Sequence, residues 1–332
     1  MKAVVMTAAG DASVLTESAI ALPELQQESD LLIRLKVAGV NPVDTKIRQR
    51  GPFVEAAGPT VLGCDGAGIV EAAGSGVRRF SVGDAVYFCS GGLGGPTGNY
   101  AEYVVVDERY VAAKPAPLSF VEAAAAPLVL ITAWEALADR ARLIAGQRLL
   151  IHGGAGGVGH VAIQLAKLVG ASVCTTVSSE AKANFVSQLG ADHCIYYPRI
   201  DFVAAVLNWT SGAGVDTALD LVGEPVLSRT FEAVKVYGDV VSVLSPTAET
   251  DWQVARSRNL RFGYELMLTP QLQHLEDARR YQTKILEQCA RRIEAGQLKI
   301  HVDQVFPLAA AAEAHRQVEQ ISGLGKVVLE IE

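Results

Sequence analysis

The spacing of apolar residues along the chain changes near residue 115. Before it, short β-branched runs alternate in part with polar positions and are separated by glycines, which predicts a compact all-β region. The expected strands are Leu31–Val40, Gly68–Ala72, Ala85–Phe88 and Tyr100–Val106, and the glycine-rich segment Gly91–Gly98 is expected to be a mobile loop. After residue 115, apolar residues recur at helical spacing, which predicts helices across Phe120–Leu137 and Val158–Leu168.

Strand-like and helix-like segments then alternate through the middle of the chain. The expected strands are Arg148–His152, Ser172–Val177, His193–Tyr197, Val215–Leu221 and Asp239–Leu244. This alternation predicts an α/β fold with a doubly wound parallel sheet and right-handed crossovers. Further on, the pattern predicts a helix across Leu275–Ala295, a short helix across Ala309–Gln320 and a last strand, Lys326–Ile331.

Composition narrows the class of protein. The 332 residues are 50% hydrophobic and 20% charged, which is enough material for two cores. The net charge is −7 and no basic block is present, so we expect no nucleic-acid partner. The longest nearly uncharged apolar stretch, Ala123–Trp134, contains a proline and is shorter than the roughly 20 residues that cross a bilayer, so we expect no membrane span. The N-terminus lacks a signal-peptide pattern and the five cysteines are an odd number, which favours a cytoplasmic protein with free thiols.

A glycine-rich loop follows the strand Arg148–His152 and opens an apolar helix. Its spacing is G-x-G-x-x-G, a pattern that permits a tight turn and lets backbone N–H groups approach a pyrophosphate. The positive end of the following helix favours the same negative charge. The loop therefore predicts dinucleotide binding, although a purely structural turn would also use these glycines. The expected contacts are Gly154, Ala155, Gly156, Gly157, Val158 and Gly159.

The end of the second strand of this sheet indicates which dinucleotide is bound. An NAD-specific site places an acidic residue there, about 20 residues beyond the loop. Here the place is occupied by Ser178 and Ser179, and Lys182 follows within one helical turn. Two hydroxyls and a cation suit a 2′-phosphate, so NADPH is the expected cofactor. Two alternatives remain: a serine that only caps the next helix, and Glu180 as a ribose acceptor.

Motifs elsewhere in the chain point to a known family. They are Ala38–Thr45, Gly63–Val70, Val82–Val86, Tyr100–Tyr103, Ile131–Trp134, the glycine loop and Gly325–Val328. Together they make the chain resemble, nearly end to end, the zinc-independent quinone oxidoreductases, the zeta-crystallin-like branch of the medium-chain dehydrogenase/reductase superfamily. The resemblance implies a GroES-like, β-rich catalytic domain at residues 1–118 and 264–332, and a Rossmann cofactor domain at residues 119–263.

The resemblance also assigns roles to residues. It implies a catalytic site lined by Asn41, Asp44 and Lys46, although an Asx turn or helix cap would explain Asn41 and Asp44, and a solvated surface lysine would explain Lys46. Thr132 matches a position that contacts nicotinamide or its ribose, or is a helix-interior threonine. Tyr197 matches an aromatic residue that flanks the adenosine phosphate in relatives, or is a strand-end tyrosine. Leu244 and Ser245 are expected at the carboxyl edge of the sheet, where the ribose of a nucleotide would pass. The remaining expected cofactor positions are Leu221, Val222 and Lys326.

No metal is expected. All six histidines lie at residue 152 or later, so the N-terminal region has none. By the same resemblance, the positions where zinc-containing relatives carry their first cysteine ligand and their histidine ligand are occupied here by Asn41 and Cys64. One thiol cannot complete a set of three N or S ligands. Cys64 is therefore expected to be a small buried residue.

The implied function is a metal-free, NADPH-dependent reductase of quinones or α,β-unsaturated carbonyls, acting as a homodimer. A second hypothesis is an enoyl-CoA or acryloyl-CoA reductase. It would need a basic cluster for the CoA phosphates, which is not obvious, and Phe53 stands where several relatives carry a tyrosine. A third hypothesis is a nucleotide-binding protein without catalysis, with a crystallin-like or RNA-associated role. The retained Asn41, Asp44 and Thr132 favour an enzyme.

Overall fold

The computed structural model describes residues 1–54, 58–95, 97–320 and 323–331. The chain divides into two compact units, one made of Met1–Val129 with Leu268–Glu332 and the other of Leu130–Met267. The boundary expected at residue 119 precedes helix α2 (Phe120–Ala125), which packs on strands β3 (Asp30–Val40) and β5 (Asp65–Ala73) of the first unit.

The second unit contains a six-stranded sheet in which every neighbouring pair is parallel. Its order is β11-β10-β9-β12-β13-β14. The strands are β9 (Arg148–His152), β10 (Ser172–Val177), β11 (His193–Tyr196), β12 (Val215–Asp220), β13 (Val234–Ser242) and β14 (Arg261–Tyr264). This is the Rossmann order, so the expected α/β doubly wound class is confirmed.

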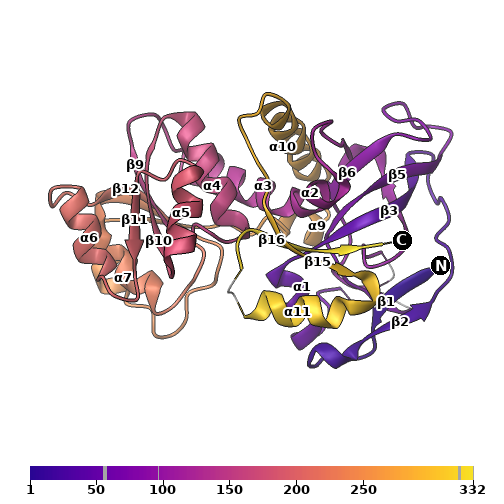
Figure 1. The fold of residues 1–332 in the computed structure, drawn as a ribbon, viewed down its shortest axis with the longest axis horizontal. Helices are drawn as coiled ribbons and strands as arrows, with labels where there is room; N and C mark the ends of the chain where they lie inside the picture. The colour runs from indigo at the N-terminus through magenta and orange to yellow at the C-terminus, as the bar shows by residue number, and fades with distance from the viewer. Residues whose placement is uncertain (55–57, 96, 321–322, 332) are drawn as a thin grey trace. The chain divides into compact units, whose positions relative to one another are not determined.

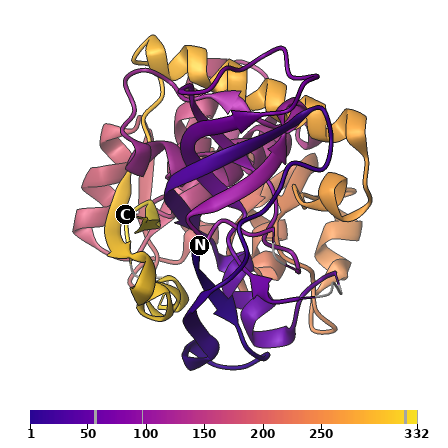
Figure 2. The same cartoon turned by 90° about the vertical axis from the view of Figure 1, so that its right-hand side faces the viewer.

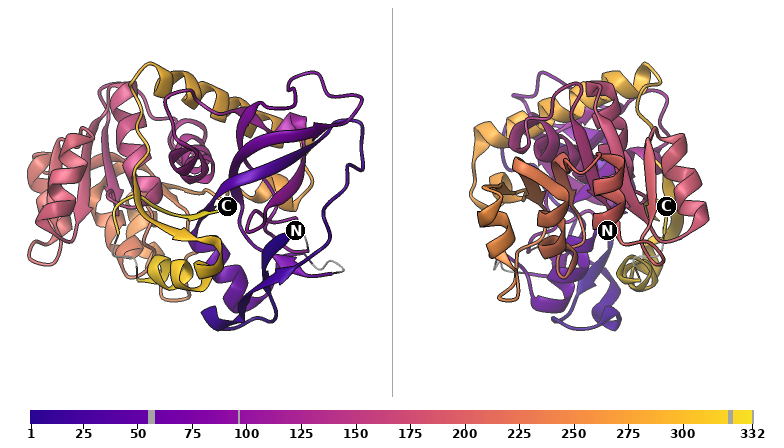
Figure 3. Two further views of the ribbon diagram at one scale, coloured as in Figure 1. Left: turned by 45° about the vertical axis from the view of Figure 1, so that its right-hand side comes forward. Right: turned by 90° about the vertical axis from the view of Figure 1, so that its left-hand side faces the viewer.

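Helices cover both faces of that sheet, with α4 and α5 on one side and α6 and α7 on the other (Figure 1 and the right-hand view of Figure 3). The helices are α4 (Gly157–Val169), α5 (Glu180–Gln188), α6 (Phe202–Trp209), α7 (Val226–Ala233) and α8 (Trp252–Ser257). The central strand β9 carries a continuous apolar run, Leu149–Ile151, because helices cover both of its faces, and Leu150, Ala218 and Val240 belong to one core cluster.

The first unit is built on a seven-stranded sheet of order β15-β16-β3-β5-β6-β8, with β7 also paired to β3. Its other strands are β6 (Ala85–Cys89), β7 (Tyr103–Asp107), β8 (Ala112–Ala113), β15 (Val302–Pro307) and β16 (Lys326–Glu330). A separate sheet joins β1 (Lys2–Met6) to β2 (Leu15–Ala19) and β4 (Thr60–Val61). Since β16 pairs antiparallel with β3, Val327 lies opposite Val40.

Helices pack on this sheet and around its edges. They are α1 (Pro42–Arg50), α9 (Thr269–Leu272), α10 (Glu276–Glu294) and α11 (Ala311–Glu319), with 3-10 turns η1 (Ala12–Val14), η2 (Glu108–Tyr110) and η4 (Leu308–Ala310). Helix α10 contacts η2 and β8, and Figure 2 shows it running along one side of the strands. Helix α11 contacts α1 and β16, next to the start of the chain in the left-hand view of Figure 3.

Several expected elements differ from the structure. The N-terminal region is not all-β, because Asn41 and Pro42 start helix α1. The single helix expected across residues 120–137 is wrong: α2 stops before Pro127, which lacks an N–H, and α3 (Pro127–Trp134) leads into a π-helix, Glu135–Arg140.

Strand ends differ as well. The strand expected from Tyr100 begins at Tyr103, and Leu221, Leu244 and Ser245 lie just beyond the ends of β12 and β13. Of the loop expected at residues 91–98, residue 96 lies outside the described residues and the rest contains neither helix nor strand. In the described part of the chain, no helix is both long enough and apolar enough to cross a membrane.

Candidate functional site

The glycine loop folds tightly against strand β10 and helix α4. Gly153 has a φ of 74°, and its carbonyl accepts a hydrogen bond from the Gly156 N–H at 3.0 Å. A Cβ on Gly154 would lie 2.1 Å from Thr175 Oγ1, and one on Gly159 would lie 2.3 Å from the Gly153 carbonyl oxygen. Neither position admits a side chain, so the loop keeps its backbone against its neighbours.

This loop fits a dinucleotide pyrophosphate. Gly156 is the extended N-cap of α4 and has no side chain to satisfy the first N–H groups of the helix. Those groups have no partner within a helix, and the helix dipole adds a positive potential at the same end. The glycine loop and the start of α4 therefore offer backbone N–H donors and no side chains that would block a pyrophosphate.

Most of the cofactor positions expected from the sequence lie at one edge of the sheet. Ser178 follows β10, Tyr197 follows β11, Val222 follows β12 and Ser245 follows β13. Because these strands are parallel, their carboxyl ends share the edge that holds the glycine loop, where Rossmann folds bind dinucleotides. Leu221 and Leu244 accompany them.

Two of the expected positions lie elsewhere. Thr132 is buried on α3, near the start of the second unit. Lys326 belongs to the first unit, where it lies beside Asn41. The structure thus brings Lys326 together with an expected catalytic residue.

Ser179 and Lys182 are linked through the cap of α5. Ser179 Oγ accepts the Lys182 N–H at 3.2 Å, so Ser179 does cap the helix, as one alternative held. Its hydroxyl proton is still available for donation. Ser178 and Lys182 are half-buried, whereas Glu180 is exposed in the first turn of α5 and Tyr197 is 54% exposed.

The expected catalytic residue Asn41 is fixed at both ends of its side chain. Its Nδ2 donates to Asp65 Oδ2 at 2.9 Å, and its Oδ1 accepts from Lys326 Nζ. An ammonium can only donate, so the contact with Lys326 identifies which atom is the oxygen. Asn41 is 1% exposed, and one of its two Nδ2 hydrogens is not used by Asp65.

Asp44 is engaged by groups from three parts of the first unit. It accepts the Asn41 backbone N–H at 2.8 Å and the Tyr100 hydroxyl at 3.3 Å through Oδ2, and the Cys64 thiol at 3.6 Å through Oδ1. Burial raises the pKa of Asp44 to about 7, against the lowering effect of the hydrogen bond from Asn41. The carboxyl group is wholly enclosed and holds the first turn of α1.

Asp65 and Lys326 form a buried ion pair that sequence reasoning missed. Asp65 Oδ2 lies 3.7 Å from Lys326 Nζ, and Asp65 Oδ1 accepts the Leu128 N–H at 2.9 Å. Burial raises the pKa of Asp65 and lowers that of Lys326, while the attraction between the two charges opposes both shifts. The motifs Gly63–Val70 and Gly325–Val328 contain Asp65 and Lys326, but nothing in the sequence indicates that these two residues pair.

Other functional candidates also went unpredicted. Tyr100 OH lies 3.1 Å from His315 Nε2, which extends the network around Asp44 to helix α11. Burial lowers the pKa of His315 to about 3, so this imidazole is neutral near pH 7.

Lys46, the third expected catalytic residue, is half-buried, and burial lowers its pKa.

Cys64 is fully buried, as expected from the sequence. Within residues 1–54, 58–95, 97–320 and 323–331, no group of three or more His, Cys, Asp or Glu side chains could hold a metal ion. The absence of zinc remains a prediction for metal analysis.

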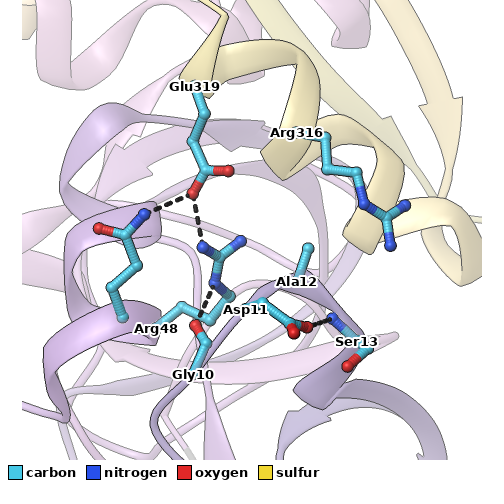
Figure 4. A pocket seen from close by; sticks show the side chains of 8 residues that line it. Gly10, Asp11, Ala12, Ser13, Arg48, Arg316 and Glu319 are labelled. Carbon is cyan, nitrogen blue, oxygen red and sulfur yellow. Dashed lines mark hydrogen bonds and ion pairs between the residues drawn. The ribbon is translucent and has the colours of Figure 1, made fainter.

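A polar pocket of about 660 Å³ lies elsewhere on the first unit, between η1, α1 and α11 (Figure 4). Arg48 crosses its floor, donating to the Gly10 carbonyl at 3.2 Å and pairing with Glu319 at 2.5 Å. Gln49 Nε2 donates to the same Glu319 oxygen at 2.9 Å. None of these hydrogen bonds or ion pairs involves Asn41, Asp65 or Lys326.

Two family models match the chain. The alcohol dehydrogenase GroES-like domain matches residues 27–116, and the zinc-binding dehydrogenase family matches residues 189–329. These matches fall in the β-rich first unit and across the second unit into the C-terminal segment.

Among curated proteins, the chain is similar to reductases of conjugated carbonyls and of quinones. It is 34% identical to the 2-methylene-furan-3-one reductase of Solanum lycopersicum and 34% identical to an NADPH-dependent alkenal/one oxidoreductase of Arabidopsis thaliana; both alignments cover 99% of this chain and 79% of the relative. It is 32% identical to a quinone oxidoreductase of Pseudomonas aeruginosa, over 90% of each chain.

Solved structures show the same architecture. An NAD-dependent alcohol dehydrogenase matches with a TM-score of 0.89 and 32% identity, over the whole of both chains. The quinone oxidoreductase of Escherichia coli in complex with NADPH matches with a TM-score of 0.88 and 27% identity, over 99% of this chain and 100% of that one.

Proposed function

Because this chain is an oxidoreductase of the medium-chain dehydrogenase/reductase superfamily, we propose that it reduces quinones or α,β-unsaturated carbonyl compounds with NADPH and without a metal ion. The observation that carries the proposal is the Asn41 side chain, which is fixed by Asp65 and Lys326 and retains one N–H. The position thus provides an oriented but weak hydrogen-bond donor.

The second unit supports NADPH as the cofactor. The glycine loop and the start of α4 would hold the pyrophosphate, and Ser178 with Lys182 would hold the 2′-phosphate. The end of β10 carries hydroxyl groups where NAD-specific sites carry an acid. NADPH also appears in the names of the Arabidopsis relative and the Escherichia coli structure.

Bound NADPH supplies a hydride from C4 of its nicotinamide. The free N–H of Asn41 would donate to the carbonyl oxygen of the acceptor, where negative charge develops when the hydride arrives. Asp65 and Lys326 prevent the amide from turning, so the donor needs no reorganisation during the reaction. Asp44 acts as a positioning residue in this scheme, because its carboxylate holds the backbone of Asn41.

The strength of the donor determines the class of substrate. In a quinone or an enone, conjugation spreads the arriving charge onto oxygen, where solvent or a modest donor can protonate it. A simple ketone lacks this relief, so its reduction requires a stronger electrophile such as zinc or a positioned acid. Lys46 is a second candidate donor, since its pKa is lowered by burial and the side chain remains half-exposed.

The test is a substrate panel with the purified protein. NADPH consumption is followed with a quinone, an enone, an enoyl-CoA and a simple ketone, and NADPH formation is followed with NADP⁺ and an alcohol. We expect the quinone or the enone to react fastest. Faster reduction of the ketone or oxidation of the alcohol would contradict the proposed mechanism, and a preference for the enoyl-CoA would favour the second hypothesis.

A homodimer is part of the proposal. Strand β14 is an edge of the six-stranded sheet and carries Tyr264, which is 56% exposed. Pairing of two β14 edges around a two-fold axis would cover this edge. Light scattering should then give about twice the 35.1 kDa of one chain, and a single-chain mass at micromolar concentration would contradict it.

All five cysteines are free thiols, which supports the cytoplasm as the location.

A further inference from the structure

His152 is a buried histidine that the proposed chemistry does not use. It is the last residue of β9, immediately before the glycine loop, and it is 1% exposed. Its Nδ1 lies 3.3 Å from Thr176 Oγ1 on β10, and its Nε2 lies 3.0 Å from Thr230 Oγ1 on α7. The imidazole therefore joins a strand on one side of β9 to a helix of the same unit.

The directions of these hydrogen bonds follow from the neighbouring groups. The Thr230 hydroxyl donates to the Val226 carbonyl at 2.8 Å, so its oxygen accepts from His152 Nε2–H. Nδ1 of the neutral ring is then an acceptor, and the Thr176 hydroxyl donates to it. Burial lowers the pKa of His152 to about 4, which keeps the ring neutral near pH 7.

The same Thr176 oxygen accepts the Gly153 N–H at 3.2 Å. One directed chain of hydrogen bonds thus runs from the Gly153 amide through Thr176, His152 and Thr230 to the Val226 carbonyl. We call it the His152 chain. Each hydroxyl in it both accepts and donates, so the loss of one hydroxyl leaves the preceding donor without an acceptor and the following acceptor without a donor.

The two ends of the His152 chain lie in the two turns at the cofactor edge. Gly153 begins the glycine loop, and its carbonyl accepts the Gly156 N–H. Val226 begins α7, and its N–H donates to Gly223 in the turn after β12 at 2.9 Å. Asp220 fixes that turn, because its carboxylate accepts the Val222 and Gly223 N–H groups at 3.0 Å each.

We propose that His152, together with Thr176 and Thr230, is a positioning residue that sets the glycine loop for the dinucleotide and couples the loop to the turn after β12. This inference rests on the proposed function, since NADPH is the ligand of the loop. His152 has both ring nitrogens engaged by threonines, so it acts through Gly153 and touches no reacting atom.

The distinguishing variant is Thr230→Val. Thr230 lies on α7 and is fully buried, but removal of its hydroxyl breaks the His152 chain. We expect Thr176→Val and Thr230→Val each to raise the NADPH dissociation constant by roughly fivefold, the effect of one neutral buried hydrogen bond. The double variant should bind about as weakly as either single variant, because both changes break the same chain.

Thr210→Val is the matched control. Thr210 Oγ1 also accepts a glycine N–H, that of Gly214 at 2.9 Å, and donates to Val206 at 2.8 Å. It is as deeply buried, but it lies before β12 at the opposite end of the strand from the loop. The variant should lose comparable stability and keep the NADPH dissociation constant within about twofold, and Thr176→Ser, which retains the hydroxyl, should restore binding.

Titration calorimetry with NADPH and amide hydrogen exchange without nucleotide give the two readouts. Exchange at Gly153 should become faster in Thr230→Val and stay unchanged in Thr210→Val. The inference is overturned if Thr230→Val leaves both NADPH binding and Gly153 exchange at their original values, or if Thr210→Val weakens NADPH as much. Failure of the unmodified protein to bind NADPH would instead overturn the proposed cofactor, whatever the exchange data show.

Discussion

The ammonium of Lys326 lies 3.7 Å from the carboxylate of Asp65, and both side chains are buried. The two residues come from opposite ends of the chain and meet because β16 pairs with β3, which in turn pairs with β5. Asn41 lies between them and bonds to both. The orientation of the proposed donor therefore depends on a charge pair within the first unit.

Removal of the Lys326 charge should destabilise the protein strongly. Lys326→Met leaves Asp65 buried without its counter-charge, and a broken buried pair costs about 3–5 kcal/mol. The free energy of unfolding in urea measures the loss. Arg280→Met is the control, since Arg280 pairs with Asp277 at the surface, where such pairs contribute at most about 1 kcal/mol. Equal losses of unfolding free energy in the two variants would show that the buried pair stabilises the protein no more than a surface pair does.

Asn41→Ala should separate catalysis from cofactor binding. The variant removes the one oriented donor, so kcat for a quinone or enone should fall by about 10- to 100-fold, while the NADPH dissociation constant should hardly change. Steady-state kinetics and calorimetry on the same preparation make the comparison. Asn184→Ala, on the exposed face of α5, is expected to alter neither. If kcat is retained in Asn41→Ala, another group is the donor.

Asp44→Asn should change how stability depends on pH. Burial raises the pKa of Asp44 from 3.8 to about 7, so between these pH values the folded protein holds a proton that the unfolded chain has released. The stability that this group contributes is therefore greatest below pH 4 and is lost as pH rises through 7.

The variant carries no such charge and keeps an oxygen for the Asn41 N–H. Its free energy of unfolding, relative to the original protein, should rise between pH 4 and pH 8 by roughly 1.4 kcal/mol or more, the equivalent of a tenfold change in proton affinity. Urea unfolding at a series of pH values tests this. A difference that stays constant across the range would mean that Asp44 is ionised throughout.

Lys182→Ala should remove most of the preference for NADPH over NADH. We expect the unmodified protein to bind NADPH at least tenfold more tightly, about 1.4 kcal/mol, because Lys182 and Ser178 would contact the 2′-phosphate. Lys235→Ala is the control, since Lys235 pairs with Asp216 at the other end of β12. Equal dissociation constants for the two dinucleotides in the unmodified protein would defeat the assignment.

Local sequence patterns predicted the cofactor unit well because its signals are local. Arg148–His152 and Ser172–Val177 are strands with the expected bounds, since buried parallel strands are short apolar runs that end at turn residues. The glycine loop can likewise be recognised from a short segment, Arg148–Gly159. Asn41 is the N-cap of α1, as one of the alternatives to its catalytic role held, because Pro42 cannot continue a strand.

Contacts between distant segments could not be predicted in the same way. The pairing of Lys326 with Asp65 depends on the register of β16 against β3, and no local pattern encodes that register. The link from Asp44 through Tyr100 to His315 could not be predicted for the same reason, because it joins three segments that are distant in the sequence. The helix break at Pro127 was readable, but the continuous helical periodicity on both sides of it outweighed the proline.

Single-turnover reduction of an enone with NADPH carrying deuterium at C4 tests the central claim most directly. The site proposed around Asn41 offers one weak donor, so the hydride should go to the β-carbon, where conjugation relieves the charge, and not to the carbonyl carbon. With deuterium in the transferred position, mass spectrometry and NMR of the product should find a saturated ketone labelled at the β-carbon. An allylic alcohol labelled at the former carbonyl carbon would contradict the account.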